Sequence, residues 1–263
     1  MNFLHIILLG IIQGLTEFFP ISSSGHLVLF QNLFGLKEPQ IFVDIMLHIG
    51  TLFSLLLFLR KKIYSLAASL ICFIKSPKKY TANPDVKWLL YLFIASIPTA
   101  LIGYLFSDFF ESLFASVLTV GIALLVTGAF LFITKYFYPR GRPQKIHALL
   151  IGILQGLAIV PGFSRSGFTI GGGLICGWKR KEAAEFSFLL SIPAILGASL
   201  FQLQKIGIHN HSWLLLLTGV ASSAISGYLA LSFLYNLVQK GKFFSFSFYC
   251  FAAGTIVLIL YFI

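Results

Sequence analysis

The sequence contains little charge, and negative charge is scarcest of all. Aspartate and glutamate together occur 8 times against 19 lysines and arginines, and these four types make up only 10% of the 263 residues. Apolar residues account for 58%, compared with about 45–50% in ordinary soluble domains. A water-soluble fold could not bury so much apolar surface, which excludes disordered chains, secreted disulfide scaffolds and soluble enzymes. The composition predicts an all-α polytopic membrane protein.

Cysteine is also scarce. Cys72, Cys176 and Cys250 are the only three; they form no C-x-x-C pair, and their odd number leaves one unpaired. The sequence therefore indicates neither a disulfide framework nor a cysteine metal site. No lysine or arginine precedes Lys37, so the basic region of a signal peptide is lacking, and we expect the N-terminal segment to belong to the mature protein.

The net charge of +11 does not indicate a nucleic-acid-binding protein. Nucleic-acid-binding domains gather lysine and arginine on one face, whereas here these residues stand in short clusters between apolar runs. Clusters of this kind mark the cytoplasmic loops of membrane proteins. We therefore expect the bilayer to be a partner, and nucleic acid not to be one.

Six apolar segments are long enough to cross a bilayer, which takes about 20 helical residues. The first contains Asp44, and the other five contain no Asp, Glu, Lys or Arg. We expect one transmembrane helix in each segment: 41–59, 88–106, 113–134, 186–203, 213–238 and 243–263. The shorter apolar run 64–74 predicts a helix that lies in the membrane interface.

Two further apolar stretches, 3–36 and 146–178, are interrupted by Gly, Pro and Ser and resemble each other. The sequence GIIQGL that begins at Gly10 matches GILQGL at Gly152, an offset of 142 residues. At the same offset the cluster SSSG at 22–25 falls on SRSG at 164–167. These matches predict two copies of one broken helical hairpin.

Each broken hairpin is followed by three of the predicted spans. We therefore expect one integral membrane domain, 1–263, with repeat one at about 1–140 and repeat two at about 141–263. Because three is odd, the second repeat must be inverted relative to the first. Inverted repeats with paired broken segments place a binding site near the bilayer midplane.

The distribution of positive charge supports this topology. With residues 1–40 outside, the loops inside the cell hold sixteen of the nineteen lysines and arginines, and only Lys37 and Lys205 fall outside. The remaining one, Arg165, lies within the second broken segment. This arrangement requires both hairpins to be re-entrant, the first from the outside and the second from the cytoplasm, and it follows the positive-inside rule.

Each broken segment contains one charged residue deep in its apolar sequence, Glu17 in the first and Arg165 in the second. Such a residue costs at least about 2.5–3.5 kcal/mol on insertion scales, so it normally faces a cavity or a partner. Two simpler interpretations stay open: Glu17 could lie at the outer interface, and the two residues could form a purely structural pair.

The residues around Arg165 favour a bound anion. Hydroxyls and unhindered N–H groups at the start of a half-helix bind phosphate, and arginine adds bidentate recognition. His26 could transfer a proton near neutral pH. Gln13 and Gln155 recur at equivalent positions and predict hydrogen bonds between helices, with a role in the site also open to Gln13. The candidate substrate-binding residues are Gln13, Ser22, Ser24, Gly25, Ser164, Ser166, Gly167 and Thr169.

Other polar and small residues favour structural roles. Asp44 and His48, spaced i, i+4, predict a structural pair on the first span. Lys181 and Glu185 have the same spacing and predict a pair on a helix surface. The three glycines 171–173 predict close helix packing. No nucleotide-binding P-loop sequence is present.

Two long motifs resemble those of a known family. QGLTEFFPISSSGH at 13–26 and PGFSRSGFT at 161–169 resemble the signature segments of the BacA-type undecaprenyl-diphosphatases, the bacitracin-resistance family, and the resemblance extends over essentially the whole chain. It implies a hydrolase of the bacterial inner membrane that converts undecaprenyl diphosphate to undecaprenyl phosphate. Such an enzyme recycles the lipid carrier of peptidoglycan synthesis, confers bacitracin resistance and opens its active site to the periplasm. The catalytic residues implied are Glu17, Ser23, His26 and Arg165.

Two chemical routes and one other function stay open. Ser23 could attack phosphorus while Glu17 or His26 accepts its proton, or an activated water could attack directly. No covalently bound cofactor is expected, but Glu17, as the only candidate ligand, could hold Mg²⁺ or Ca²⁺ on the diphosphate. The alternative function is a secondary transporter or flippase for a phosphate-containing anion, because the same fold and pocket would suit one. A homodimer is also left open.

Overall fold

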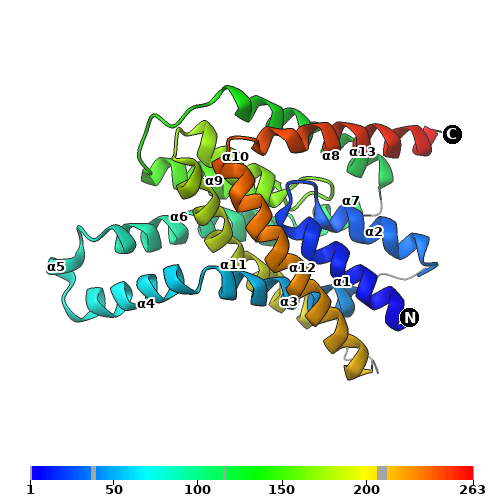
Figure 1. Ribbon diagram of the computed structural model, residues 1–263, viewed down its shortest axis with the longest axis horizontal. Coiled ribbons are helices and arrows are strands. Elements are labelled where there is room, and N and C mark those ends of the chain that lie inside the picture. Colours follow the sequence, from blue (N-terminus) through cyan, green and yellow to red (C-terminus); the bar gives the residue numbers. More distant parts are fainter. Residues whose placement is uncertain (1, 37–39, 115, 206–211, 263) are drawn as a thin grey trace.

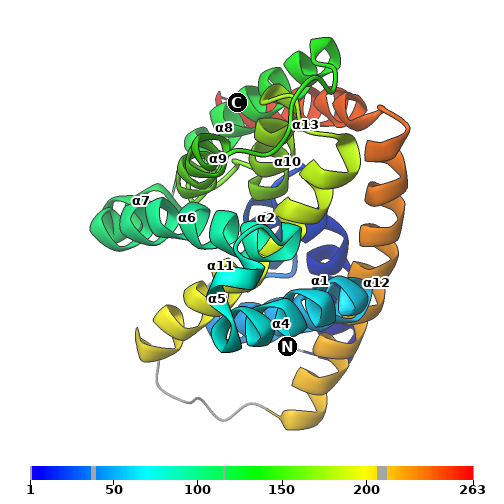
Figure 2. The ribbon, with the colours of Figure 1, turned by 90° about the vertical axis from the view of Figure 1, so that its left-hand side faces the viewer.

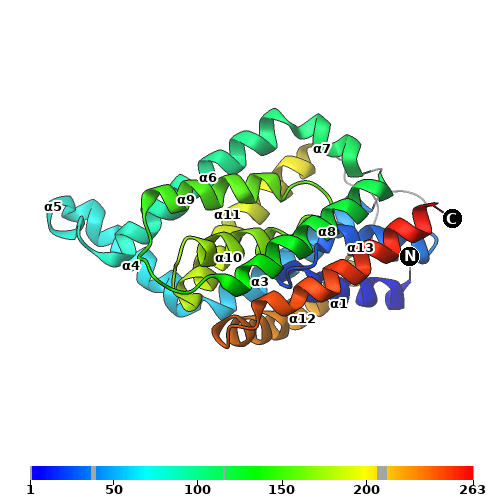
Figure 3. The ribbon, with the colours of Figure 1, turned by 90° about the horizontal axis from the view of Figure 1, so that it is seen from above.

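The computed structural model describes residues 2–36, 40–114, 116–205 and 212–262, so Lys37 lies outside the described residues. Within these ranges the chain forms helices joined by turns, and no β-strand occurs. The helices pack into one elongated body (Figure 1). The beginning of the first helix and the end of the last lie at the same end of this body (Figures 1 and 3).

Among the described residues, six helices are long and apolar enough to cross a membrane, and they occupy the six predicted spans. Short 3-10 turns follow the third of them at Thr134–Tyr136 and precede the sixth at Phe243–Ser245. The prediction of an all-helical, multi-span membrane protein is therefore confirmed. The six helices are α3 (Ile41–Phe58), α6 (Pro84–Leu105), α8 (Val117–Ile133), α11 (Arg180–Lys205), α12 (Trp213–Gln239) and α13 (Phe246–Phe262).

Some helix ends differ from the predicted ones because a capping side chain sets them. α6 begins before position 88, at Pro84, where the side chain of Asn83 accepts a hydrogen bond from the amide of Asp85 at 2.8 Å. α8 begins after position 113, because a separate helix α7 (Ser107–Phe114) ends there and Ser116 caps the new helix. Capping residues of this kind satisfy the free amides of a first helical turn.

The apolar run 64–74 lies in helix α4 (Arg60–Lys75), which follows α3 after one residue. α4 and the short α5 (Pro77–Tyr80) carry the chain to the end of the body opposite the termini (Figures 1 and 3). Lys62 of α4 forms an ion pair with Asp85 of α6 at 2.7 Å, which holds these two helices together. The helix is thus confirmed, whereas its position at the membrane interface stays a prediction.

Both broken segments are helix–turn–helix hairpins. The first consists of α1 (Phe3–Phe18) and α2 (Ser23–Leu33), and the second of α9 (Lys145–Leu157) and α10 (Arg165–Ile175). α2 and α10 begin at positions related by the same offset of 142 as the sequence repeat. The predicted breaks are therefore confirmed. The re-entrant path of each hairpin stays a prediction.

Each hairpin packs against the middle span that follows the other hairpin. α1 lies along α12, and α9 lies along α6 (Figures 1 and 2). The equivalent glycines Gly10 and Gly152 permit both contacts: a Cβ on Gly10 would lie 2.7 Å from the carbonyl oxygen of Gly219, and one on Gly152 would lie 2.2 Å from that of Ala95. The inversion of the two repeats in the bilayer stays a prediction.

Two smaller predictions are confirmed. A Cβ on any of the glycines 171–173 would lie within 3.0 Å of a neighbouring side chain, so this segment packs closely. Lys181 and Glu185 form the expected pair at 3.8 Å. Gly171 faces Phe130 of α8, Gly172 faces Leu154 of α9 and Gly173 faces Ala183 of α11, so α10 is packed closely among three helices.

Candidate active site

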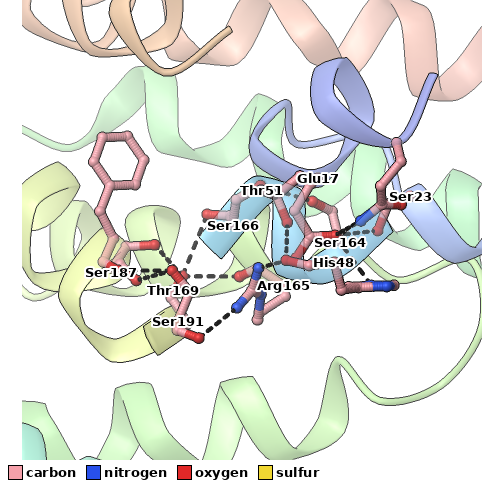
Figure 4. A network of polar contacts seen from close by, with 12 residues as sticks. Glu17, Ser23, His48, Thr51, Ser164, Arg165, Ser166, Thr169, Ser187 and Ser191 are labelled. Atoms are coloured by element: carbon pink, nitrogen blue, oxygen red, sulfur yellow. Dashed lines mark hydrogen bonds and ion pairs between the residues drawn. The ribbon is translucent and has the colours of Figure 1, made fainter. Parts of the chain in front are cut away.

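Glu17 and Arg165 meet where the two hairpins come together. Glu17 lies in the last turn of α1, and Arg165 is the first residue of α10. Nη2 of Arg165 donates a hydrogen bond to Oε1 of Glu17, and the side chain of Glu17 is only 5% exposed (Figure 4). The pairing of these two charges, which the sequence left open as an alternative, is therefore present, and Glu17 is surrounded by protein.

The second carboxylate oxygen of Glu17 is just as closely surrounded. Oε2 accepts a hydrogen bond from the hydroxyl of Ser23 at 2.7 Å and another from Nε2 of Gln13 at 3.0 Å. Nε2 of His48 lies 3.6 Å from the same oxygen. Residues from α1, α2, α3 and α10 thus converge on one carboxylate (Figure 4).

Arg165 is held on both sides. Nη1 of its guanidinium donates to the carbonyl oxygen of Ser191 at 3.3 Å. Its own carbonyl oxygen accepts from the hydroxyl of Thr169 at 2.8 Å, and that hydroxyl also contacts Oγ of Ser187 at 2.5 Å (Figure 4). A guanidinium has five N–H donors in a planar fork, so the two contacts to Glu17 and Ser191 leave donors for an anion.

The two serine clusters form the first turns of α2 and α10, with Ser22 and Ser164 just in front of the helices. The hydroxyl of Ser164 caps α10 by accepting from the amide of Gly167 at 3.1 Å, and it lies 3.2 Å from that of Ser166. A Cβ on Gly167 would lie 3.3 Å from Cβ of Pro20, which belongs to the first turn. The turn of the first hairpin therefore packs against the start of α10.

The turn of the first hairpin is strained at Ser22. This residue has φ of 69°, in the left-handed region that glycine favours. Its hydroxyl lies 3.4 Å from both the amide of Gly25 and the hydroxyl of Ser24. Strained backbone persists where the surrounding structure enforces it and is common at functional sites.

His26 is the one predicted catalytic residue that contacts neither Glu17 nor Arg165 among the described residues. Its Nδ1 donates to the carbonyl oxygen of Ser22 at 2.8 Å, and its Nε2 lies 2.6 Å from the hydroxyl of Tyr249 on α13. Because a carbonyl only accepts, the neutral ring carries its proton on Nδ1 and accepts from Tyr249 at Nε2. His26 therefore connects the first turn to α13.

His48 contacts Asp44 as expected, but through the backbone of Asp44 and not through its carboxylate. Nδ1 of His48 donates to the backbone carbonyl of Asp44 at 2.7 Å, while the carboxylate of Asp44 accepts from Nε2 of Gln31 at 2.7 Å. The other ring nitrogen of His48 is directed at Glu17. The signal was its position in a membrane span, where an ionisable residue normally serves a site.

Sequence reasoning also missed Ser187, Ser191 and Tyr249. Their contacts depend on which faces of α11 and α13 turn toward the hairpins, and small hydroxyl residues in an apolar span give no distinctive signal. Gln155 forms the expected interhelical hydrogen bond, to the hydroxyl of Thr99 at 3.1 Å. Gln13, at the equivalent position, contacts Glu17, and its Oε1 is a buried acceptor without a partner in the described part of the chain.

The residues at the site do not fit a metal ion held by protein ligands alone. In the described ranges, no group of three or more His, Cys, Asp or Glu side chains could coordinate a metal. Glu17 is the one carboxylate in the site, and both of its oxygens already accept hydrogen bonds. A cation site at Glu17 would therefore have to break these contacts.

Comparisons with known proteins identify a family for the chain as a whole. Residues 6–256 match the family described as "Bacitracin resistance protein BacA". The chain is 43% identical over 268 residues to the "Undecaprenyl-diphosphatase" of Halothermothrix orenii, covering 99% of this chain and 98% of that protein. It is 42% identical to the proteins of the same name from Desulforapulum autotrophicum, with 98% of each chain covered, and Alkaliphilus metalliredigens, with 96% of each covered.

Proposed function

The chain belongs to the bacitracin resistance protein BacA family, and we propose that it is an undecaprenyl-diphosphatase. It would hydrolyse the phosphoanhydride of undecaprenyl diphosphate to undecaprenyl phosphate and inorganic phosphate. In the bacterial inner membrane this reaction recycles the lipid carrier of peptidoglycan synthesis and confers bacitracin resistance. The observation that carries the proposal is the contact of Glu17 with both Ser23 and Arg165 at the junction of the hairpins.

We assign the nucleophile to Ser23 and its base to Glu17. The hydroxyl of Ser23 already donates to Oε2 of Glu17 at 2.7 Å, which is the geometry that a general base needs. His26 has no such contact, since both of its ring nitrogens are engaged by Ser22 and Tyr249. As Ser23 attacks the terminal phosphorus, its proton passes to Glu17 and the bond to the bridging oxygen breaks. The electron pair leaves with undecaprenyl phosphate.

Arg165 and the first turns of α2 and α10 would neutralise the charge of the diphosphate. Phosphoryl transfer depends mainly on positioning and on donors directed at the equatorial oxygens. Arg165 can provide a planar fork, and the first turns of α2 and α10 provide amides and a favourable helix dipole. Once Glu17 has released the proton of Ser23 to the departing undecaprenyl phosphate, water would attack the phosphoserine and give a proton to Glu17, and Oγ of Ser23 would leave and be protonated again. We derive no step through a metal ion.

Access to the site is proposed to be from the periplasm. The basis is the excess of Lys and Arg in the loops that the topology places inside. Two cysteine substitutions test it after removal of the native cysteines: Ser212→Cys on the outer side and Lys78→Cys on the inner side. An impermeant reagent should label position 212 in intact spheroplasts and position 78 only after lysis, and the reverse result would invert the topology.

The deciding experiment uses the purified protein in detergent, without a second compartment. An enzyme releases inorganic phosphate from a polyprenyl diphosphate under these conditions. A transporter or flippase has no bond to break and releases none. Protein purified in parallel with Glu17→Gln controls for contaminating phosphatases. Equal release by both preparations would refute the proposed function. Light scattering of the active preparation would determine whether it is a homodimer.

A further inference from the structure

His48 reaches the candidate site from α3, although the reaction described above gives it no task. Its Nδ1 faces the carbonyl of Asp44 at 2.7 Å, and a carbonyl can only accept, so Nδ1 carries a proton. Its Nε2 lies 3.6 Å from Oε2 of Glu17. A proton on Nε2 as well would place a positive charge beside this oxygen. The geometry is that of an imidazolium beside a carboxylate.

Arg165 faces two anions in the proposed reaction. Before substrate binds, its Nη2 is paired with Oε1 of Glu17. A diphosphate at the helix starts would compete for the same guanidinium. Any movement of Arg165 toward phosphate weakens its pairing with a carboxylate that is only 5% exposed. Leaving a buried charge without its partner is strongly unfavourable, so Glu17 needs a second cation.

We propose that His48 is a positioning residue that keeps Glu17 ionised and in place when Arg165 turns to the diphosphate. The two cations contact different oxygens of Glu17, Arg165 at Oε1 and His48 at Oε2. Loss of one contact therefore leaves the other intact. His48 also lies at the oxygen that accepts from Ser23, so it preserves the orientation of the base toward the nucleophile. This inference rests on the proposed function.

The proposal predicts a dependence on pH, because only protonated His48 carries the charge. Of the titratable groups in the described residues, Glu17 on α1 and Asp44 on α3 itself face His48, and Arg165 on α10 acts through Glu17. α12, which also packs on α3, contains no charged residue. On α11, which also packs on α3, Glu185 is engaged by Lys181 and by the hydroxyl of Tyr235. Turnover should therefore fall as rising pH removes the proton of His48.

The test compares His48→Gln with wild type over a range from about pH 6 to about pH 9, where histidine titrates. Glutamine can still donate a hydrogen bond to Glu17 but has no charge to lose. At neutral pH we expect kcat to fall about tenfold with KM within about twofold. The alkaline decline of the wild type should be absent from the variant. His48→Ala should lose more, and added imidazole should restore part of it.

The matched control is His147→Gln. His147 lies outside the site on α9, and its Nδ1 accepts from Nε1 of Trp178 at 2.9 Å, which a glutamine oxygen can also do. It should keep the wild-type pH profile. The same alkaline decline in His48→Gln as in wild type, or wild-type kcat at every pH, overturns the role of His48 alone. Absence of phosphate release by the wild type overturns the proposed function, and this inference with it.

Discussion

The two hairpins share a backbone plan but carry different chemistry. At the offset of 142 residues, Ser164, Ser166 and Gly167 repeat the small residues of the first turn, whereas Glu17 is replaced by Ile159, Ser23 by Arg165 and His26 by Phe168. The first hairpin thus provides the carboxylate and the hydroxyl, and the second provides the cation. Neither copy therefore contains a site by itself, and the site arises where the two turns meet.

The hairpins also turn in different ways. The first passes through Ser22 with φ of 69°, and the second through Gly162 with φ of 94°. A glycine adopts this conformation without steric cost, whereas a serine is strained. The strained residue, Ser22, is the one that contacts both Ser24 and His26. The second turn is the relaxed copy, and its role is to hold the start of α10 in place.

The largest expected effect comes from removing either member of the charged pair. Glu17→Gln and Arg165→Met should each lower phosphate release about 100- to 1,000-fold, the usual effect of losing a group that stabilises transition-state charge. Glu17→Gln should also destabilise the protein, by about 3–5 kcal/mol, because Arg165 keeps its charge without a carboxylate partner. Arg165→Met should destabilise it less, because His48 still faces Glu17. Phosphate release and thermal unfolding in detergent measure the two effects.

The double variant Glu17→Gln with Arg165→Met separates a catalytic pair from a purely structural one. It buries no unpaired charge, so it should recover much of the lost stability. Turnover should stay low. Recovery of turnover together with stability would mean that the pair is structural and that another group performs the chemistry. Lys181→Ala, on the surface of α11, serves as the control for purification and unfolding.

The next effect concerns Ser23, the counterpart of Arg165 in the repeat. Ser23→Ala should lower kcat at least about 100-fold with little change in KM, because the substrate still meets Arg165. Rapid quench of the wild type with terminally labelled substrate should trap phosphate on the protein. Retention of kcat within about tenfold, or ~1.4 kcal/mol, would rule out a phosphoserine and favour attack by water.

Stability should distinguish the packing of the two hairpins. Gly152→Ala places its Cβ 2.2 Å from a backbone oxygen of Ala95, whereas the closest atom to a Cβ on Gly10 is the movable hydroxyl of Ser222. Overpacking of this kind costs about 1–3 kcal/mol, and Gly152→Ala should destabilise the protein more than Gly10→Ala. Gly197→Ala on α11 meets nothing within 4 Å and is the control. Equal melting temperatures for all three would contradict the packing described for α1 and α9.

Much of the architecture could be predicted because the bilayer restricts it. The absence of charge over about 20 residues is enough to identify a span, and the clusters SSSG and SRSG identify the two breaks. The pairing of Glu17 with Arg165 was predictable for the same reason, since an apolar medium forces isolated charges together. Helix ends such as Pro84 were less accessible, because a cap on Asn83 decides them and charged residues can extend a helix beyond the membrane.

The partners of His26 and His48 could not be predicted from the sequence. Both histidines lie on helices whose neighbours come from distant segments, so the rotation of each helix decides what its side chain contacts. Asp44 at i, i+4 from His48 suggested a local pair, but Gln31 from α2 takes the carboxylate of Asp44. Tyr249 comes from the last helix and is more than two hundred residues from His26.

The smallest expected effect tests the contact between the first hairpin and Tyr249 of α13. Tyr249→Phe keeps the ring beside His26 but removes the hydroxyl that lies 2.6 Å from Nε2 of His26. Loss of one such hydrogen bond costs about 0.5–1.5 kcal/mol, so kcat should fall about two- to tenfold if His26 must keep its orientation for the reaction. His26→Phe, which introduces the side chain of Phe168 at the equivalent position, should lower kcat further, because it removes the imidazole as well. Unchanged kcat in both variants would show that His26 only packs the turn against α13, and the reaction would then depend on Glu17, Ser23 and Arg165 alone.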